Sequence, residues 1–258
     1  MGVLNVTPDS FSDGGKFFDV ERAVAHAQEM AAAGADIIDV GGESSRPGAA
    51  PVSEDEELRR VIPVIERLRD LTVSIDTTKA VVADRALGAG ARIVNDISAL
   101  RFDERMVDVV HDSRAGLVLM HMKGTPRTMQ QEAQYAEVVT DVLGFLRARV
   151  AFAVDRGIGR EQIAVDPGLG FGKTVEHNLK LLAHLDEFRA LGCPVLVGAS
   201  RKSFIGKVLQ RNKGEDRLFG SVAVAAWAVA RGANVIRVHD VVETVTVVRI
   251  IEAVTQTV

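Results

Sequence analysis

Short apolar runs rich in Val, Ile and Leu alternate along this chain with longer segments whose apolar residues recur at helical spacing. Such alternation predicts βα units and a parallel sheet. Eight runs are predicted strands: Val3–Val6, Asp36–Val40, Thr72–Ile75, Arg92–Val94, Gly116–Met120, Ile163–Val165, Pro194–Val197 and Asn234–Val238. The predicted helices are Val20–Ala33, Glu54–Leu71, Lys79–Gly88, Glu104–His111, Glu137–Arg156, Glu176–Leu191, Ser203–Arg231 (in two pieces) and Val241–Val254.

Glycine punctuates these units. Gly follows a predicted helix and precedes a strand in AAAGADIID, LGAGARIVND, VDRGIGREQIAVDPG and ARGANVIRVHD, and Gly ends helices in the left-handed conformation. Eight units within 258 residues, with no linker or low-complexity tract, favour an α/β fold built as a single (β/α)8 TIM barrel. We expect one domain over residues 1–258, with parallel strands and an active site at their C-terminal ends. A doubly wound open sheet is the alternative that the pattern leaves open.

Composition narrows the class of partner. The net charge of -4 and the 5% aromatic content argue against a nucleic-acid partner, which would need clustered Lys and Arg or stacking rings. No apolar run approaches the roughly 20 residues that cross a bilayer, and the start of the chain has no secretory-signal pattern. The single cysteine, Cys193, forms no internal disulfide and is expected to be buried. We expect a cytoplasmic protein that binds small molecules, with no membrane partner.

Polar residues follow the predicted strands, where the active site of such a barrel lies. They are Asn5, the loop from Gly41, Asp76, Asn95, His121, Asp166, Ser200–Lys202, Arg237 and His239. Asp76, Asp166 and Asn95 suit a ligand with an array of N–H donors, such as an aminopyrimidinone ring. Arg237, His239 and Lys202 suit an anionic phosphate, and Asn5 offers an oxygen to Mg²⁺, whose shell is commonly completed by water and substrate phosphates. The pattern indicates a nitrogen heterocycle that carries a diphosphate.

Other familiar motifs fail on inspection. DPGLGFGKT ends like a phosphate-binding loop but has Pro167 where that pattern requires glycine. The chain lacks a dinucleotide fingerprint, a G-x-S-x-G elbow and close metal-ligand spacing among its six histidines. His121 fits a pocket wall or a local structural hydrogen bond equally well, and His177 fits a capping or packing residue at a helix start.

Longer motifs resemble one family. NVTPDSFSDGG from Asn5 and GGESSRPGA from Gly41 resemble the first and second loop signatures of dihydropteroate synthases, and SIDT, VND, LMHMKGTP, DPGLGFGKT, GASRKSFIG and IRVHD follow in the family's order. The resemblance implies a pterin-binding TIM barrel of folate biosynthesis and a target of sulfonamides. Its reaction condenses 6-hydroxymethyl-7,8-dihydropterin pyrophosphate with p-aminobenzoate, by an SN1-like loss of pyrophosphate, to give 7,8-dihydropteroate.

The resemblance also implies residue roles. Lys202, Arg237 and Asp166 would be catalytic. The substrate-binding set would be Phe11, Ser45, Arg46, Pro47, Asp76, Asn95, Met120, Asp166, Phe171, Lys202, Ser203, Arg237 and His239. Mg²⁺ would be the cofactor, held through Asn5. Relatives are usually homodimers, and the apolar stretch Ala223–Ala230 fits either such a contact or a buried packing helix.

Two departures from the family pattern stand out. Ser45 stands where a threonine is often found before Arg-Pro-Gly, and this replacement keeps the hydroxyl group. The chain also starts almost at its first strand. Two rival functions remain at this point: a methyltetrahydrofolate-type methyltransferase barrel, which shares the pocket but not the first two loops, and a pterin-binding paralogue without turnover. The first two loops and the cations disfavour the methyltransferase, and the presence of Arg46, Lys202 and Arg237 argues against the paralogue.

Overall fold

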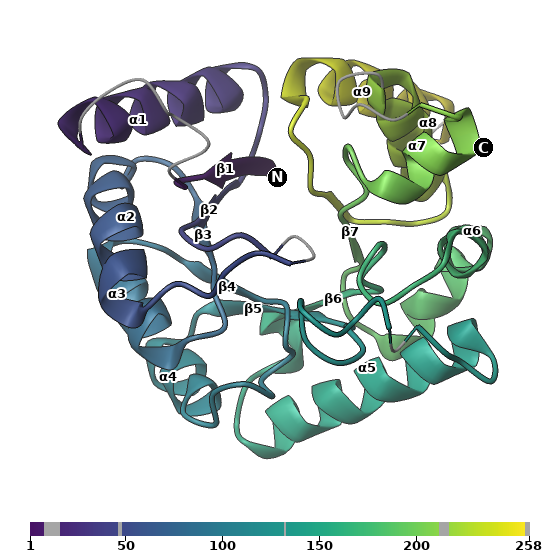
Figure 1. Cartoon of the computed structure of the whole chain (residues 1–258), viewed down its shortest axis with the longest axis horizontal. Coiled ribbons are helices and arrows are strands. Elements are labelled where there is room, and N and C mark those ends of the chain that lie inside the picture. The colour runs from purple at the N-terminus through teal and green to yellow at the C-terminus, as the bar shows by residue number, and fades with distance from the viewer. Residues whose placement is uncertain (8–15, 46–47, 132, 212–216, 256–258) are drawn as a thin grey trace.

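The computed structural model describes residues 1–7, 16–45, 48–131, 133–211 and 217–255. Within these residues, eight short strands alternate with helices around a ring (Figure 1). The strands are β1 (Gly2–Asn5), β2 (Ile38–Gly41), β3 (Val73–Asp76), β4 (Ile93–Asp96), β5 (Gly116–Met120), β6 (Ile163–Asp166), β7 (Leu196–Val197) and β8 (Val235–Ile236). The α-helices are α1 (Lys16–Ala32), α2 (Glu54–Arg67), α3 (Ala80–Ala89), α4 (Met106–Ser113), α5 (Val138–Asp155), α6 (Val175–Ala183), α7 (Ser203–Leu209), α8 (Leu218–Ala230) and α9 (Val241–Thr255).

The strands pair in chain order. β1 to β6 form one parallel sheet, and β7 pairs with β8, also in parallel. Isolated parallel bridges join the two sheets at both edges, Val165 to Val195 and Gly2 to Val238. The strands therefore follow one another around the ring, whereas a doubly wound sheet reverses its strand order at a switch point. The barrel prediction is confirmed, and the open-sheet alternative is wrong.

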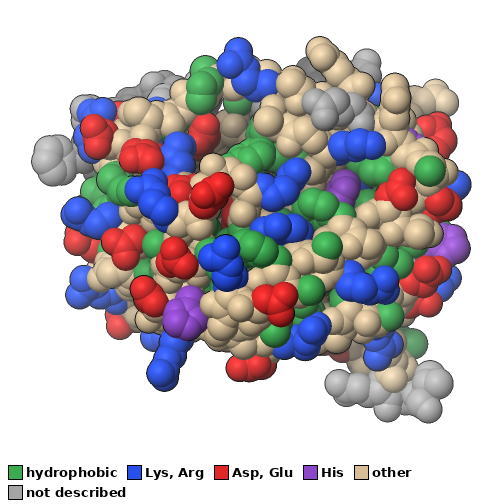
Figure 2. Space-filling model, turned by 90° about the horizontal axis from the view of Figure 1, so that it is seen from below, with side chains coloured by type: hydrophobic (Ala, Val, Ile, Leu, Met, Phe, Trp, Pro, Cys, Tyr) green, Lys and Arg blue, Asp and Glu red, His purple; other side chains and the backbone are tan. Residues whose placement is uncertain are grey.

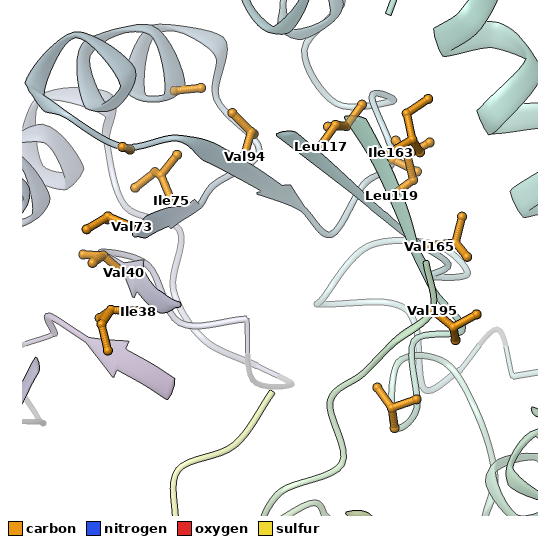
Figure 3. Close-up of a cluster of buried hydrophobic side chains, with 14 of the residues drawn as sticks. Ile38, Val40, Val73, Ile75, Val94, Leu117, Leu119, Ile163, Val165 and Val195 are labelled. Carbon is orange, nitrogen blue, oxygen red and sulfur yellow. The ribbon is translucent and has the colours of Figure 1, made fainter. Parts of the chain in front are cut away.

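The apolar core lies between the strands and the surrounding helices. Figure 3 shows side chains such as Ile38, Val40 and Ile75 on the outer, helix-facing side of their strands. Burying each such side chain stabilises the fold by roughly 1.5–3 kcal/mol relative to its exposure. Since side chains alternate along a strand, Asp39 and Ser74 face the barrel interior instead.

Element boundaries differ from the sequence predictions in two notable ways. Several strands end one residue later than predicted, because the polar residue after each apolar run, such as Asp76 and Asp166, still pairs within the sheet. The predicted helix Glu176–Leu191 is α only over α6, and then continues as a 3₁₀ helix, η3 (Leu185–Leu191). Leu185, Phe188 and Leu191 are all buried, and a 3₁₀ helix places residues three apart in one line.

The structure also shows how Cys193, the apolar helices and the surface charges are placed. Cys193 is buried, as expected, and burial raises the pKa of its thiol. Among the described residues, none of the helices combines the length and apolar character needed to span a membrane. On the face seen in Figure 2, Lys and Arg side chains are interspersed with Asp and Glu.

Candidate active site

The strand register places the predicted polar residues at one rim of the barrel. Asn5 pairs with Gly41, Gly41 with Asp76, and Asp76 with Asn95. These pairs are the last or nearly the last residues of four adjacent strands. On the other side of the ring, Met120 pairs with Asp166 at the ends of β5 and β6. Parallel strands thus carry these residues to the same end of the barrel.

An ion-pair cluster joins β8 to β2 and β3 across this rim. Arg237, directly after β8, donates through Nε to Oδ2 of Asp39 at 2.6 Å and through Nη2 to Oδ2 of Asp76 at 2.7 Å. Asp39 is fully buried, and 21% of the Arg237 side chain is exposed. Burial opposes the charge of Arg237, but Asp39 and Asp76 outweigh it and raise the pKa of the guanidinium. Arg237 is therefore a permanently charged group at the rim.

Asp76 keeps an unusual protonation equilibrium despite this ion pair. Burial raises the pKa of its carboxyl to about 7, because desolvation and the negative charge of Asp39 together exceed the attraction of Arg237. Asp76 is thus a carboxylate that a small change in surroundings can switch near neutral pH. Such perturbed groups are concentrated at functional sites.

Asp39 is a site residue that the sequence analysis missed. Its Oδ2 also accepts a hydrogen bond from Nδ2 of Asn95, at 3.0 Å. Asp39 falls inside Asp36–Val40, a run whose pattern predicts a strand but does not mark this residue as part of a site. A signal was available, since an ionised side chain in the middle of a buried strand must find partners.

The opposite side of the rim holds Asp166 and Lys202. Oδ1 of Asp166 accepts from the backbone N–H of Gly168 at 2.7 Å, and burial raises the pKa of Asp166 against the pull of Lys202. Lys202 donates from Nζ to the carbonyl of Leu169, and its Nζ lies 4.3 Å from the centre of the Phe171 ring. Burial lowers the pKa of Lys202 to about 8.

Gly198 lies between the two sides of the rim. A Cβ added at Gly198 would lie 3.8 Å from Cδ of Arg237 and 3.9 Å from Oδ2 of Asp166. These are ordinary van der Waals distances, so the Arg237 stem and the Asp166 carboxylate both lie next to Gly198. The structure therefore gathers Asp76, Asn95, Asp166 and Arg237, predicted from separate strands, into one site.

An apolar cluster borders this site. Met120, at the end of β5, packs in a buried group with Ile97, Met122 and Met129, and the partly buried Phe171 packs against it. Met120 and Phe171 were predicted as apolar walls, and both lie in this one cluster. The cluster adjoins Asp166 through Met120 and Lys202 through Phe171.

His239 and Ser203 lie on the β7–β8 side. His239 is hydrogen-bonded to Oγ of Ser200, through its backbone N–H at 3.2 Å and through Nδ1 at 3.1 Å. Ser203 is exposed and begins α7 directly after Lys202. Ser45 is half-buried in the loop after β2. Phe11, Arg46 and Pro47 lie outside the described residues.

Asn5 is the predicted metal ligand. A Cβ at Gly41 would lie 3.7 Å from Oδ1 of Asn5 and 3.8 Å from Oδ2 of Asp76, so these two oxygens face each other across a glycine. Among the described residues, no group of three or more His, Cys, Asp or Glu side chains is arranged to hold a metal ion. Asn5 fits Mg²⁺ only as one hard oxygen donor, with the other ligands supplied by substrate phosphates and water.

A buried lysine supports the loop beneath the site. Nζ of Lys173 contacts Nδ1 of His121 at 2.9 Å and donates to the carbonyls of Gly168 and Phe171 at 2.9 and 3.0 Å. Burial, together with Lys173, lowers the pKa of His121 to about 2, so its imidazole is neutral. His121 therefore makes a local structural hydrogen bond, one of the two predicted readings. His177 forms a capping box with Thr174 at the start of α6, as expected.

Comparison with known proteins identifies the relatives of this chain. A family model described as "Pterin binding enzyme" matches residues 1–239. A dihydropteroate synthase of Synechocystis is 49% identical over 244 residues, covering 93% of this chain and 84% of the relative. The dihydropteroate synthase of Escherichia coli is 48% identical over 256 residues, covering 98% of this chain and 90% of the relative.

Solved structures agree as well. The Yersinia pestis dihydropteroate synthase in a sulfonamide drug complex has a TM-score of 0.93 and 46% identity, covering 99% of this chain and 94% of the other. The Xanthomonas albilineans enzyme with 4-aminobenzoic acid has a TM-score of 0.93 and 48% identity, covering 99% and 92%. The chain belongs to the dihydropteroate synthase family of pterin-binding enzymes.

Proposed function

We propose that this rim joins 6-hydroxymethyl-7,8-dihydropterin pyrophosphate to p-aminobenzoate, giving 7,8-dihydropteroate and pyrophosphate. The chain is thus a transferase of folate biosynthesis. One observation carries the assignment of residues. Arg237 is held between Asp39 and Asp76, while the Asp166 carboxylate, which interacts with Lys202, lies near Arg237 across Gly198. A cation for a leaving diphosphate therefore lies beside carboxylates for an electron-poor ring.

The heterocycle end of the site is formed by Asp76, Asn95 and Asp166. Carboxylate oxygens accept the N–H bonds of an aminopyrimidinone edge, and two such bonds fix the ring in plane. Met120 and Phe171 lie in the apolar cluster beside Asp166, where a ring face can be covered. These contacts hold the exocyclic methylene of the pterin toward Arg237.

The diphosphate end is formed by Arg237, His239 and Asn5. The guanidinium stays charged throughout, so it stabilises the negative charge that develops on the departing group. His239, oriented by Ser200, offers a further donor. Asn5 would contribute one oxygen to Mg²⁺, which when bound would neutralise phosphate charge.

Bond breaking precedes bond making in this scheme. The C–O bond to the diphosphate breaks with its electron pair on the leaving oxygen, and the dihydropterin ring delocalises the positive charge left on the methylene. Asp76 and Asp166 favour that cation by charge and position. The amine nitrogen of p-aminobenzoate then forms the new C–N bond and releases a proton to solvent, so no protein nucleophile is required.

The p-aminobenzoate end is proposed to lie near Lys202, Ser203 and Ser45. Lys202 presents a cation beside Phe171, which suits an aromatic carboxylate. The dihydropteroate synthase of Xanthomonas albilineans has been solved with 4-aminobenzoic acid and with 7,8-dihydropteroate. Phe11, Arg46 and Pro47 complete the proposed pocket from outside the described residues.

One assay separates this function from its rivals. Protein, Mg²⁺ and the dihydropterin pyrophosphate are mixed with or without p-aminobenzoate, and pyrophosphate release is followed. We expect release that depends on the amine. Binding of the ester without release would favour a paralogue that lacks turnover, and failure to bind the ester would exclude the synthase and that paralogue together.

We also propose that the chain works in the cytoplasm as a single-domain subunit of a homodimer. Phe219 on α8 is 87% exposed and Trp227 is 44% exposed. Trp227 also lines an apolar hollow between α6 and α8, with Leu179, Leu182, Ala183, Ala223 and Val224. Exposed apolar side chains and an apolar hollow on the same helix fit a contact surface. Light scattering should give twice the 27.7 kDa chain mass. Phe219→Asp should shift the measured mass toward that of a single chain.

A further inference from the structure

One ionised side chain lies deeper in the barrel than the substrate-facing rim. Asp39 is the second residue of β2, in register with Ser74 of β3, and its side chain is 0% exposed. Its neighbours Ile38 and Val40 face the helices (Figure 3), so the Asp39 carboxylate faces the barrel interior. Burying a carboxylate is unfavourable unless charge and hydrogen bonds compensate for it.

The partners of Asp39 come from both ends of the proposed site. A single oxygen, Oδ2, accepts from Nε of Arg237 at 2.6 Å and from Nδ2 of Asn95 at 3.0 Å. The other oxygen, Oδ1, is buried and has no hydrogen-bond partner among the described residues. An even arrangement would place one hydrogen-bond donor on each oxygen of the carboxylate. Instead, both donors converge on one atom.

This convergence fixes two orientations at once. Holding Nδ2 of Asn95 sets the direction of its amide, and therefore where its carbonyl oxygen is presented. The guanidinium of Arg237 is held at Nε by Asp39 and at Nη2 by Asp76, so its plane is fixed at two points. Pairs of donors fixed on one anion cannot move independently of each other.

We propose that Asp39 is a positioning residue that sets Asn95 at the heterocycle end and Arg237 at the diphosphate end relative to each other. The inference rests on the proposed function for the identity of the two ends. Asp39 itself is too deep to contact substrate and acts through its two donors. Preorganised groups of this kind must be held to within about 0.5 Å, and buried hydrogen-bonded neighbours supply that support.

The test separates the two ends with two small probes. Calorimetry measures the binding of 6-hydroxymethylpterin alone and of inorganic pyrophosphate with Mg²⁺, to the wild-type chain and to Asp39→Asn. Because the variant removes a charged acceptor from both donors, each affinity should fall at least about 10-fold. Circular dichroism and thermal melts establish the folded fraction to which the affinities are referred.

Ser74→Ala is the matched control. Ser74 is buried on the adjacent strand in register with Asp39, and its Oγ likewise has no partner among the described residues. Both probe affinities should stay within about twofold of wild type, because an apolar replacement of an unpaired hydroxyl removes no interaction. A general sensitivity of the barrel interior would instead affect both variants equally.

A second variant keeps the inference testable should Asp39→Asn fail to fold. Asn95→Ala leaves the Asp39–Arg237 ion pair in place but frees the shared oxygen. Coupling through Asp39 predicts that pyrophosphate affinity changes at least about fivefold, although Asn95 belongs to the other end. In the folded double variant, Asp39→Asn should weaken pterin binding no further than Asn95→Ala does alone.

The outcomes are distinct. The positioning role is overturned if Asn95→Ala leaves the pyrophosphate affinity unchanged, or if folded Asp39→Asn leaves both affinities unchanged. Either result leaves the proposed function standing. A wild-type chain that binds neither probe removes the proposed function itself.

Discussion

Replacing Arg237 with Met tests the ion-pair cluster, because Met keeps much of the length of the side chain and removes its charge. Arg237 is the partner of two carboxylates, and its loss leaves Asp39, 0% exposed, and Asp76, 14% exposed, without their cation. Removing one partner of a buried ion pair typically costs about 3–5 kcal/mol, mainly as the penalty for an uncompensated charge. With two carboxylates affected, we expect the upper part of that range.

The expected change in melting temperature follows from chain size. For domains of 150–250 residues, 1 kcal/mol corresponds to roughly 2–4 °C, so a loss of about 4–5 kcal/mol in Arg237→Met should lower Tm by about 8–20 °C. Arg105→Met is the control, since Arg105 is 63% exposed and pairs with Asp103 at the surface. Exposed pairs contribute about 0–1 kcal/mol, so that variant should lose at most about 4 °C.

The dependence on pH gives this prediction a sign. The pKa of Asp76 is raised to about 7 in the folded protein, above its value near 3.9 in an unfolded chain. Such a carboxyl destabilises the fold increasingly as pH rises between those two values, and losing Arg237 raises its folded pKa further. The deficit of Arg237→Met relative to wild type, measured by calorimetric melts, should therefore be larger at pH 7.5 than at pH 4.5. A drop no greater than that of Arg105→Met, or a deficit that grows toward low pH, would refute the reasoning.

Three further predictions concern activity and backbone geometry. The kcat/KM profile should fall on the acid side of about pH 7 as Asp76 gains a proton, and on the alkaline side of about pH 8 as Lys202 loses one. Asp76→Asn should remove the decrease on the acid side. Lys202→Ala should lower turnover by on the order of 10²-fold. Gly168→Ala places a Cβ 1.9 Å from the carbonyl oxygen of His121 at a φ of +69° and should cost about 3 kcal/mol in denaturant unfolding, whereas Gly88→Ala in α3, with nothing within 4 Å, should stabilise by about 0.5–1 kcal/mol. Chelation of Mg²⁺ should suppress pyrophosphate release, and Asn5→Ala should raise the Mg²⁺ concentration for half-maximal rate on the order of 10-fold; an unchanged Mg²⁺ requirement would remove Asn5 from the metal site.

The order of strands and helices was predictable because it follows from the local spacing of apolar residues. Apolar runs of strand length alternate with helical spacing, and parallel strands present their C-terminal ends at one rim. The sequence alone therefore groups Asp76, Asn95 and Asp166 at one end of the barrel. Their roles toward a ligand, and those of Met120, Phe171, Ser203 and His239, remain predictions.

The pairings within the site could not be read from sequence. The two acceptors of Arg237 are 198 and 161 residues away in the chain, and no local pattern encodes contacts of that range. Asp39 was missed because its apolar neighbours predict a strand whether or not the residue between them belongs to a site. The choice between two roles for His121 likewise depended on Lys173, 52 residues away.

A crystal structure of the chain with a dihydropterin diphosphate bound would test the central claim most directly. We predict that the pterin ring contacts Asp76 and Asp166, and that the phosphates contact Arg237 and His239. A ligand bound with its phosphates against the carboxylates, or bound away from this rim, would contradict the account.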